Sequence, residues 1–283
     1  MIRDGHVRGQ GAFRSPITNG SFGATFAMMY ASLFFSRSSD SRRVIALGLI
    51  SSIVIVICAH SSGPLLGLGF GLLSLLLWRF QNHTRKIRWG ILLSIVGLHL
   101  IMKAPVWFLI GRVSDIVGGG GYHRAYLIDK FVRSFDSWWL LGMSPVDTAQ
   151  WFPYELSNGA ADITNQFVSD GINAGLLGLI LSIVLLVRCF QQLGAKLRVW
   201  TTGDQGPTRF AWGIGATLVG TIGILFSVTY FDQMHVIWYF LLASVSAASV
   251  VENPEPELGL EGQANSAVAV DIDRQVDPSS QAN

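Results

Sequence analysis

The sequence predicts an all-α fold: a polytopic transmembrane helical bundle of about seven spans, with one large external loop that carries short helices. Hydrophobic residues make up 50% of the chain and charged residues 13%, and the mean hydropathy is +0.44, unlike a soluble protein. Apolar runs long enough to cross ~30 Å of hydrocarbon recur along the chain. These runs are continuously apolar, whereas barrel strands alternate apolar and polar residues, so the sequence favours helices.

The predicted membrane domain covers residues 1–251 and ends where the composition changes. Its apolar runs are residues 21–35, 44–59, 64–78, 87–110, 172–187, 210–230 and 236–251. Glycines recur in the third and sixth runs, where they would let helix backbones approach closely. Residues 252–283 are rich in Pro, Glu, Asp, Ser, Gln and Ala, so we expect a disordered acidic tail.

Basic residues mark alternate connections between the predicted spans. They concentrate in residues 37–43, 79–88 and 188–209, and such residues favour the cytoplasmic side. The tail would then be cytoplasmic, and the remaining connections would face the periplasm of a bacterial inner membrane: residues 60–63, 112–171 and 231–235. The stretch before Ser21 would also lie outside although it contains arginines, which suggests a role for them. No signal peptide precedes Ser21, so we expect the chain to be the C-terminal part of a longer membrane protein.

The long loop, residues 112–171, holds most of the candidate functional residues. Residues 122–135 predict an amphipathic helix along the membrane surface, with an apolar face of Ile128, Phe131, Val132 and Phe135. The glycines 118–121, followed by His123 and Arg124, form a candidate anion site at the start of that helix. The aromatic residues either anchor the loop in the membrane interface or stack on sugar rings: Trp138, Trp139, Trp151, Phe152 and Tyr154.

Ionisable residues also occur inside a predicted span. His99 and Lys103 lie one helical turn apart in residues 87–110, just before Pro105, and their shared face would look into the bundle or a wet cavity. Alternatively, Lys103 reaches the headgroups and His99 bonds to a neighbouring helix. The chain has no metal-binding, cofactor-binding or nucleophile motif, so we expect no metal, no cofactor and no nucleic-acid partner.

Three stretches resemble the C-terminal half of the bacterial O-antigen ligase and polymerase family. RGQGAFRSP at 8–16 is similar to the family's Arg-x-x-Gly-x-Phe-x-x-Pro element, and SSG at 61–63 is similar to its turn at the next span. In the loop, WWLLG at 138–142 and DITNQF at 162–167, followed by GLLG at 175–178, resemble its apolar Leu-x-Gly and His-Asn elements. The resemblance implies a polytopic inner-membrane enzyme that handles undecaprenyl-diphosphate-linked glycans.

The resemblance also assigns roles to individual residues. External arginines would hold the diphosphate leaving group, because a guanidinium binds it bidentately and stays protonated. Arg8 is the first candidate by motif position, followed by Arg124, with Arg14 and Arg112 as further ligands. Thr164 stands where the family commonly has His, so His123 is expected to supply the base. Further candidate substrate contacts are Trp138, Trp139, Asp162 and Asn165.

Three classes of function remain open at this stage. The leading one is an inverting transfer of a glycan from a polyprenyl-diphosphate carrier to a lipid or glycan acceptor hydroxyl at the periplasmic face. The second is a non-catalytic scaffold or lipid-binding partner in polysaccharide assembly, in which the arginines meet only lipid phosphates. The third is a transporter built on His99 and Lys103, although the sequence shows neither a repeated half nor a broken helix pair.

Overall fold

The computed structural model describes residues 2–3, 6–36, 41–116, 121–151, 161–199 and 205–250. Within these ranges the regular structure is helical apart from a short antiparallel pair, β1 (Ile2–Arg3) and β2 (His6–Val7), so the prediction of an all-helical fold is confirmed. The predicted tail, the glycines 118–120 and the aromatic residues Phe152 and Tyr154 lie outside the described residues.

Every apolar run predicted as a span contains a helix. These helices are α1 (Pro16–Ser36), α2 (Arg42–Cys58), α3 (Ser62–Leu76), α4 (Thr84–Ile101), α8 (Gln166–Val199), α9 (Gln205–Leu225) and α10 (Met234–Val250). Shorter elements join them: η2 (Leu77–His83), α5 (Phe108–Ile116), α6 (Gly121–Arg133), α7 (Phe135–Trp138) and η3 (Pro145–Trp151). Among the described residues, 3 helical stretches are long and apolar enough to cross a membrane: Ser62–Ile101, Gln166–Leu197 and Thr208–Leu225.

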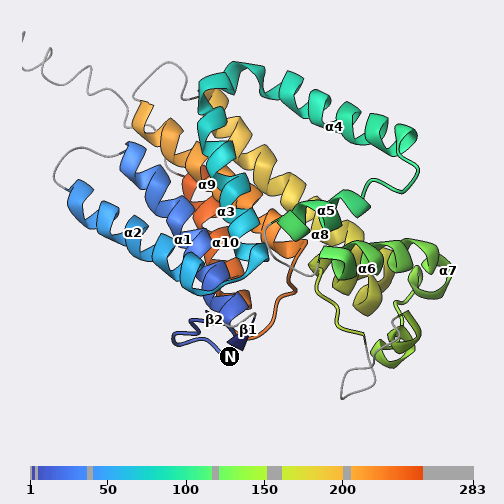
Figure 1. The fold of residues 1–283 in the computed structure, drawn as a ribbon. Helices are drawn as coiled ribbons and strands as arrows, with labels where there is room; N and C mark the ends of the chain where they lie inside the picture. Colours follow the sequence, from blue (N-terminus) through green and yellow to red (C-terminus); the bar gives the residue numbers. More distant parts are fainter. Residues whose placement is uncertain are drawn as a thin grey trace, which may run out of the picture. The chain divides into compact units, whose positions relative to one another are not determined.

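Small residues hold the centre of the bundle together. Helix α1 packs against α2, α3 and α9, and α3 packs against α9 (Figure 1). A Cβ added to Gly67 on α3 would lie 2.8 Å from the carbonyl oxygen of Gly220 on α9, which leaves no room for a side chain. The Met28 side chain of α1 lies against Gly71 and Gly220. Without a hydrophobic drive between helices in lipid, such close backbone approach provides the packing that joins them.

A second apolar cluster joins α8, α9 and α10. Leu193 of α8, Ile214 and Leu218 of α9, and Leu241 and Val245 of α10 are all buried together. Helix α10 also contributes Met234 and Ile237 to an apolar cluster with Ala24, Ala27 and Met28 of α1. Two clusters of buried side chains therefore attach α10 to the bundle.

The predicted span 87–110 is wrong at its C-terminal end. Helix α4 ends at Ile101, and Met102 is extended (φ −73°, ψ 140°). Pro105 has no N–H for the helix and disfavours the helical conformation at Ala104, which explains an early end. Lys103 therefore follows the helix, fully outside it, and the predicted shared face with His99 does not form. Helix α4 buries none of its residues, so His99 does not look into the bundle; its ring lies 5.7 Å from that of Trp107.

Helix α8 is interrupted at Gly175, whose φ of 66° and ψ of −164° are not helical. The segment after Trp138 fills the interruption: Leu176 N–H donates to Trp139 O (2.8 Å) and Met143 N–H donates to Ile172 O (2.7 Å). Gly142, with φ of 83°, lets the two backbones meet, because a Cβ there would clash with Ile172. The sequence predicts no pair of broken helices, and this interruption of α8 is a single one among the described α-helices.

Candidate functional site

One end of the bundle brings together segments that are far apart in the sequence. The turn between α2 and α3 contacts the N-terminal segment through Ala59, and Ser62, the first residue of α3, contacts α6. The connection between α9 and α10 lies against the start of α3, where a Cβ on Gly63 would be 2.8 Å from that of Ser227. Gln166, at the start of α8, accepts a hydrogen bond from the N–H of Tyr230 in the same connection (2.6 Å). These are segments that the charge pattern predicts to share one side.

Arg8 is built into the end of helix α2. The residue is only 6% exposed, and its Nε donates to the carbonyl oxygen of Ala59 (2.9 Å). The neighbouring N–H of Gly9 donates to Cys58 O (2.7 Å), and Asn19 Nδ2 donates to Gly9 O (3.1 Å). The last carbonyls of a helix need donors and favour positive charge, so this contact stabilises α2. Arg8 therefore has a structural role, and its charge lies buried at the turn.

Arg124 reaches the same turn from the long loop. Its Nη1 donates to the hydroxyl of Ser62 (3.1 Å), the first residue of α3. Ala59 and Ser62 are only three positions apart, so guanidinium groups from the N-terminal segment and from α6 meet at one short turn. The first amides of α3 point toward this turn, and a helix N-terminus adds positive partial charge. The turn is therefore contacted by two guanidinium groups and lies next to a helix N-terminus.

His123 lies beside Arg124 on α6 and contacts the segment that precedes α8. Its Nε2 is 2.9 Å from the backbone oxygen of Asp162. A carbonyl oxygen only accepts, so Nε2 carries the proton in this bond, and Nδ1 is the basic nitrogen of the neutral ring. The side chain of Asp162 is exposed. The geometry therefore orients the imidazole, as a general base requires.

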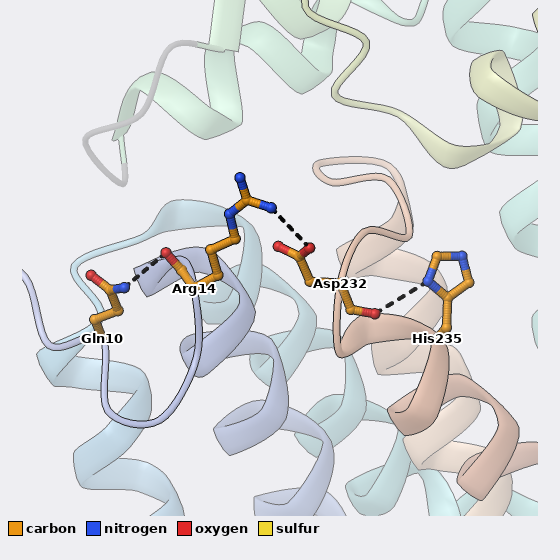
Figure 2. A network of polar contacts seen from close by, with 4 residues as sticks. All are labelled: Gln10, Arg14, Asp232 and His235. Atoms are coloured by element: carbon orange, nitrogen blue, oxygen red, sulfur yellow. Dashed lines mark hydrogen bonds and ion pairs between the residues drawn. The ribbon is translucent and has the colours of Figure 1, made fainter.

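Arg14 is in a different environment from Arg8. Its side chain is 83% exposed, and Nη1 lies 3.5 Å from Asp232 Oδ1 (Figure 2). Gln10 Nε2 donates to the backbone oxygen of Arg14 (2.8 Å), and the backbone oxygen of Asp232 lies 3.3 Å from His235 Nδ1. This exposed network links the N-terminal segment to the α9–α10 connection. Arg112 on α5 is exposed.

Three residues that the sequence predicts to contact substrate make contacts within the protein. Asn165 is 1% exposed and caps α8, because its Oδ1 accepts from the N–H groups of Phe167 (2.9 Å) and Val168 (3.2 Å). Trp138 is buried, stacks on Phe131 at 3.9 Å between ring centroids and donates to Phe131 O (2.7 Å), so its ring is not presented to a ligand. Trp139 is 44% exposed and contacts α8 through its backbone.

The buried face of α6 differs from the predicted one. Phe131 is buried as predicted, but Val132 and Phe135, the latter in α7, are 47% and 41% exposed, and Asp129 is buried. Arg133 Nε (2.8 Å) and Trp107 Nε1 (3.3 Å) both contact the Asp129 carboxylate. Helix α5 packs against α6 and brings Trp107 into place, which makes a carboxylate tolerable on the inner face. Periodicity alone could not reveal a partner from another element.

A polar cluster at the interruption of α8 was missed by the sequence analysis. The carboxylate of Asp170 accepts from Gln166 Nε2 (2.7 Å) and from Ser182 Oγ (2.6 Å), which lies beyond the break. Burial, and then the charge of Asp170, raise the pKa of the Tyr230 hydroxyl far above its usual value, so it stays protonated. An acidic residue beside a long apolar run was the available signal.

This end of the bundle brings the guanidinium groups of Arg8 and Arg124 and the imidazole of His123 to neighbouring elements. Among the described residues, no group of three or more His, Cys, Asp or Glu side chains is placed to hold a metal ion. Comparison with protein-family models finds none that matches the sequence, and comparison with curated proteins finds no match. Functional inference therefore depends on the residues of this chain.

Proposed function

We propose that the protein is a glycan transferase of the O-antigen ligase and polymerase type in a bacterial inner membrane. It would move a glycan from a polyprenyl-diphosphate carrier to an acceptor hydroxyl at the periplasmic face. The observation that carries the proposal is the meeting of Arg8 and Arg124 at the turn between α2 and α3. Arg8 lies in the stretch 8–16 that resembles the family, and Arg124 is one of the external arginines to which the resemblance assigns diphosphate binding.

The proposed reaction needs stabilisation of a leaving diphosphate. As the bond from the anomeric carbon to the diphosphate breaks, negative charge grows on the departing oxygen, and guanidinium groups can stabilise it. The acceptor oxygen attacks the opposite face of that carbon, and its proton passes to a base. In this proposal Arg124 contacts the diphosphate, Arg8 adds buried positive charge, and Nδ1 of His123 takes the proton.

The location of the turn also suits a lipid-linked donor. It lies at the start of α3, which begins the apolar stretch Ser62–Ile101, and the α3 residues Leu65 and Phe70 are 45% and 47% exposed. A polyprenyl chain could lie along these side chains while its diphosphate meets the cationic turn. The topology proposed from the basic residues has about seven spans, and it puts residues 112–171 on the periplasmic side.

The test compares Arg124→Gln with Lys130→Gln, which removes the same charge from the same helix. We expect Arg124→Gln to lower glycan transfer at least about 100-fold at normal protein level, as loss of a transition-state donor does. Lys130→Gln, which only removes a contact with the Tyr126 ring, should keep transfer within about twofold. Transfer is measured as polymer or ligated glycan at the cell surface in cells that carry each variant in place of the native copy.

A binding measurement separates the transferase from a lipid-binding scaffold. Undecaprenyl diphosphate should raise the melting temperature of the purified wild-type protein more than undecaprenyl monophosphate does, and Arg124→Gln should remove the difference. Normal glycan in cells with Arg124→Gln would refute the transferase. Diphosphate binding that depends on Arg124, without any change in glycan, would instead favour the scaffold.

A further inference from the structure

A basic surface lies at the opposite end of α3 from the candidate site. It consists of Arg79 in η2 and Arg85, Lys86 and Arg88 in the first turns of α4, and we call these residues the basic belt. All of them are exposed. The sequence contains no Asp or Glu from Ser62 to Ile101, so this stretch has only positive charges.

The basic belt has no acidic partner in the part of the chain that the structure describes. Ion pairs among the described residues join Arg14 to Asp232 and Arg133 to Asp129, and neither involves the belt. Exposed bases without partners contribute nothing to folding and repel one another. Their concentration within a ten-residue stretch therefore calls for an anion from outside the chain.

Aromatic and aliphatic side chains flank the basic belt on both sides. Phe80 and Trp89 are each 53% exposed, and Leu76 at the end of α3 is 74% exposed. Helix α4 continues with exposed Leu and Ile residues and buries nothing, and a Cβ on Gly90 or Gly97 would meet no atom within 4 Å. Bases and aromatic rings beside exposed apolar side chains are typical of a membrane interface.

Contacts with the bundle fix the position of this surface. Trp78, next to Arg79, meets the Trp212 ring of α9 edge to face at 5.7 Å between centroids. Trp212 Nε1 in turn donates to the backbone oxygen of Ser74 on α3 (2.9 Å). The helix bends just after this point, at Phe80 (φ −112°, ψ 23°), so α3 and α4 leave the anchored tryptophan in different directions.

We propose that the basic belt binds the phosphate headgroups of anionic phospholipids, with their acyl chains against α3 and α4. Charge complementarity favours an anion, and the flanking apolar side chains favour a lipid over a soluble acidic protein or a nucleic acid, neither of which would cover them. The inference is independent of the proposed glycan transfer, because the belt lies at the far end of α3.

The experiment uses the full chain reconstituted in phosphatidylcholine vesicles that contain increasing fractions of brominated phosphatidylglycerol. Bromine quenches tryptophan fluorescence at short range, so the quenching curve, compared with that for brominated phosphatidylcholine, reports the preference for the anionic lipid. We expect the wild-type protein to prefer phosphatidylglycerol, and the preference should weaken as salt rises. In the variant R79Q/R85Q/K86Q/R88Q, the preference for phosphatidylglycerol over phosphatidylcholine should fall at least about fivefold.

The charge-preserving variant R79K/R85K/K86R/R88K is the matched control, since it changes the same positions but keeps their charge. It should retain the preference, and circular dichroism should show normal helix content for both variants. Equal quenching by the two lipids in the wild-type protein, or an unchanged preference after the four Gln substitutions, overturns the proposal. So does full competition by soluble glycerol phosphate or by polyglutamate, which would assign the surface to a soluble anion or an acidic protein.

Discussion

Helices α3 and α4 follow one another in the sequence, and both are apolar and contain glycine, yet their surroundings are opposite. In α3, Gly67 and Gly71 face α9 and Met28 with no room for a Cβ. In α4, Gly90 and Gly97 meet nothing, and no residue is buried. Hydropathy therefore places both helices in one apolar stretch but does not distinguish a glycine packed against protein from one with no protein neighbour.

The polar contacts of the molecule show the same contrast. Asp170 accepts two short hydrogen bonds between the halves of α8, in a half-buried position. Arg14 meets Asp232 at 3.5 Å with most of its side chain in solvent. A contact shielded from water contributes to stability, whereas an exposed ion pair contributes little.

The largest expected effect comes from filling the α3–α9 contact. Gly220→Leu would force a side chain against Met28 and the backbone of Gly67, so we expect it to destabilise the protein by about 3 kcal/mol or prevent folding. Gly97→Leu on α4 is the matched control and should change the unfolding free energy by less than about 0.5 kcal/mol. Unfolding in detergent, followed by circular dichroism, measures both. A milder Gly220→Ala variant keeps the test usable if Leu is not tolerated, and equal effects at positions 220 and 97 would break the comparison.

An intermediate effect is expected from Asp170→Ala. It removes the acceptor for Gln166 and Ser182, and hydrogen bonds to a charged group typically contribute about 1.5–3 kcal/mol. Asp136→Ala removes an exposed acid from α7 and should have almost no effect on the unfolding free energy. If the two variants unfold at the same denaturant concentration, the cluster at the α8 break does not stabilise the fold.

The smallest effect is expected from Arg14→Gln. The ion pair with Asp232 is long and exposed, so its loss should cost no more than about 0.5 kcal/mol. Any cost should shrink further as salt screens the pair. Unfolding curves at low and high salt check both statements. A loss above about 1 kcal/mol would show that exposure is a poor guide to the value of this contact.

Much of the fold was predictable because the hydropathy and length of an apolar run are properties of neighbouring residues in the sequence. Each predicted run contains a helix, and most of the predicted helix 122–135 forms α6, which ends at Arg133. The early end of α4 was also within reach of the sequence, since Pro105 restricts Ala104. The cap at Asn165 was another available signal, because Asn before an apolar helix is a preferred N-cap residue.

The candidate site was predictable only as a set of residues, not as an arrangement. Arg8 and Arg124 were identified from the resemblance, but their meeting at the turn between α2 and α3 depends on contacts across more than fifty positions of sequence. Trp138 was also predicted from the sequence to contact substrate, but its ring is buried in an apolar cluster with Phe131 and Ile172. Asp170 and Ser182 come together only because α8 folds back at Gly175.

The sequence by itself determined that the chain is helical and apolar, because backbone hydrogen bonding and side-chain hydropathy depend on neighbours along the chain. Only the tertiary structure decided which apolar faces meet protein and which stay bare, which carboxylates acquire partners, and which arginines share a turn. Those outcomes depend on groups from distant elements meeting at atomic distances, and a linear pattern carries no record of such meetings.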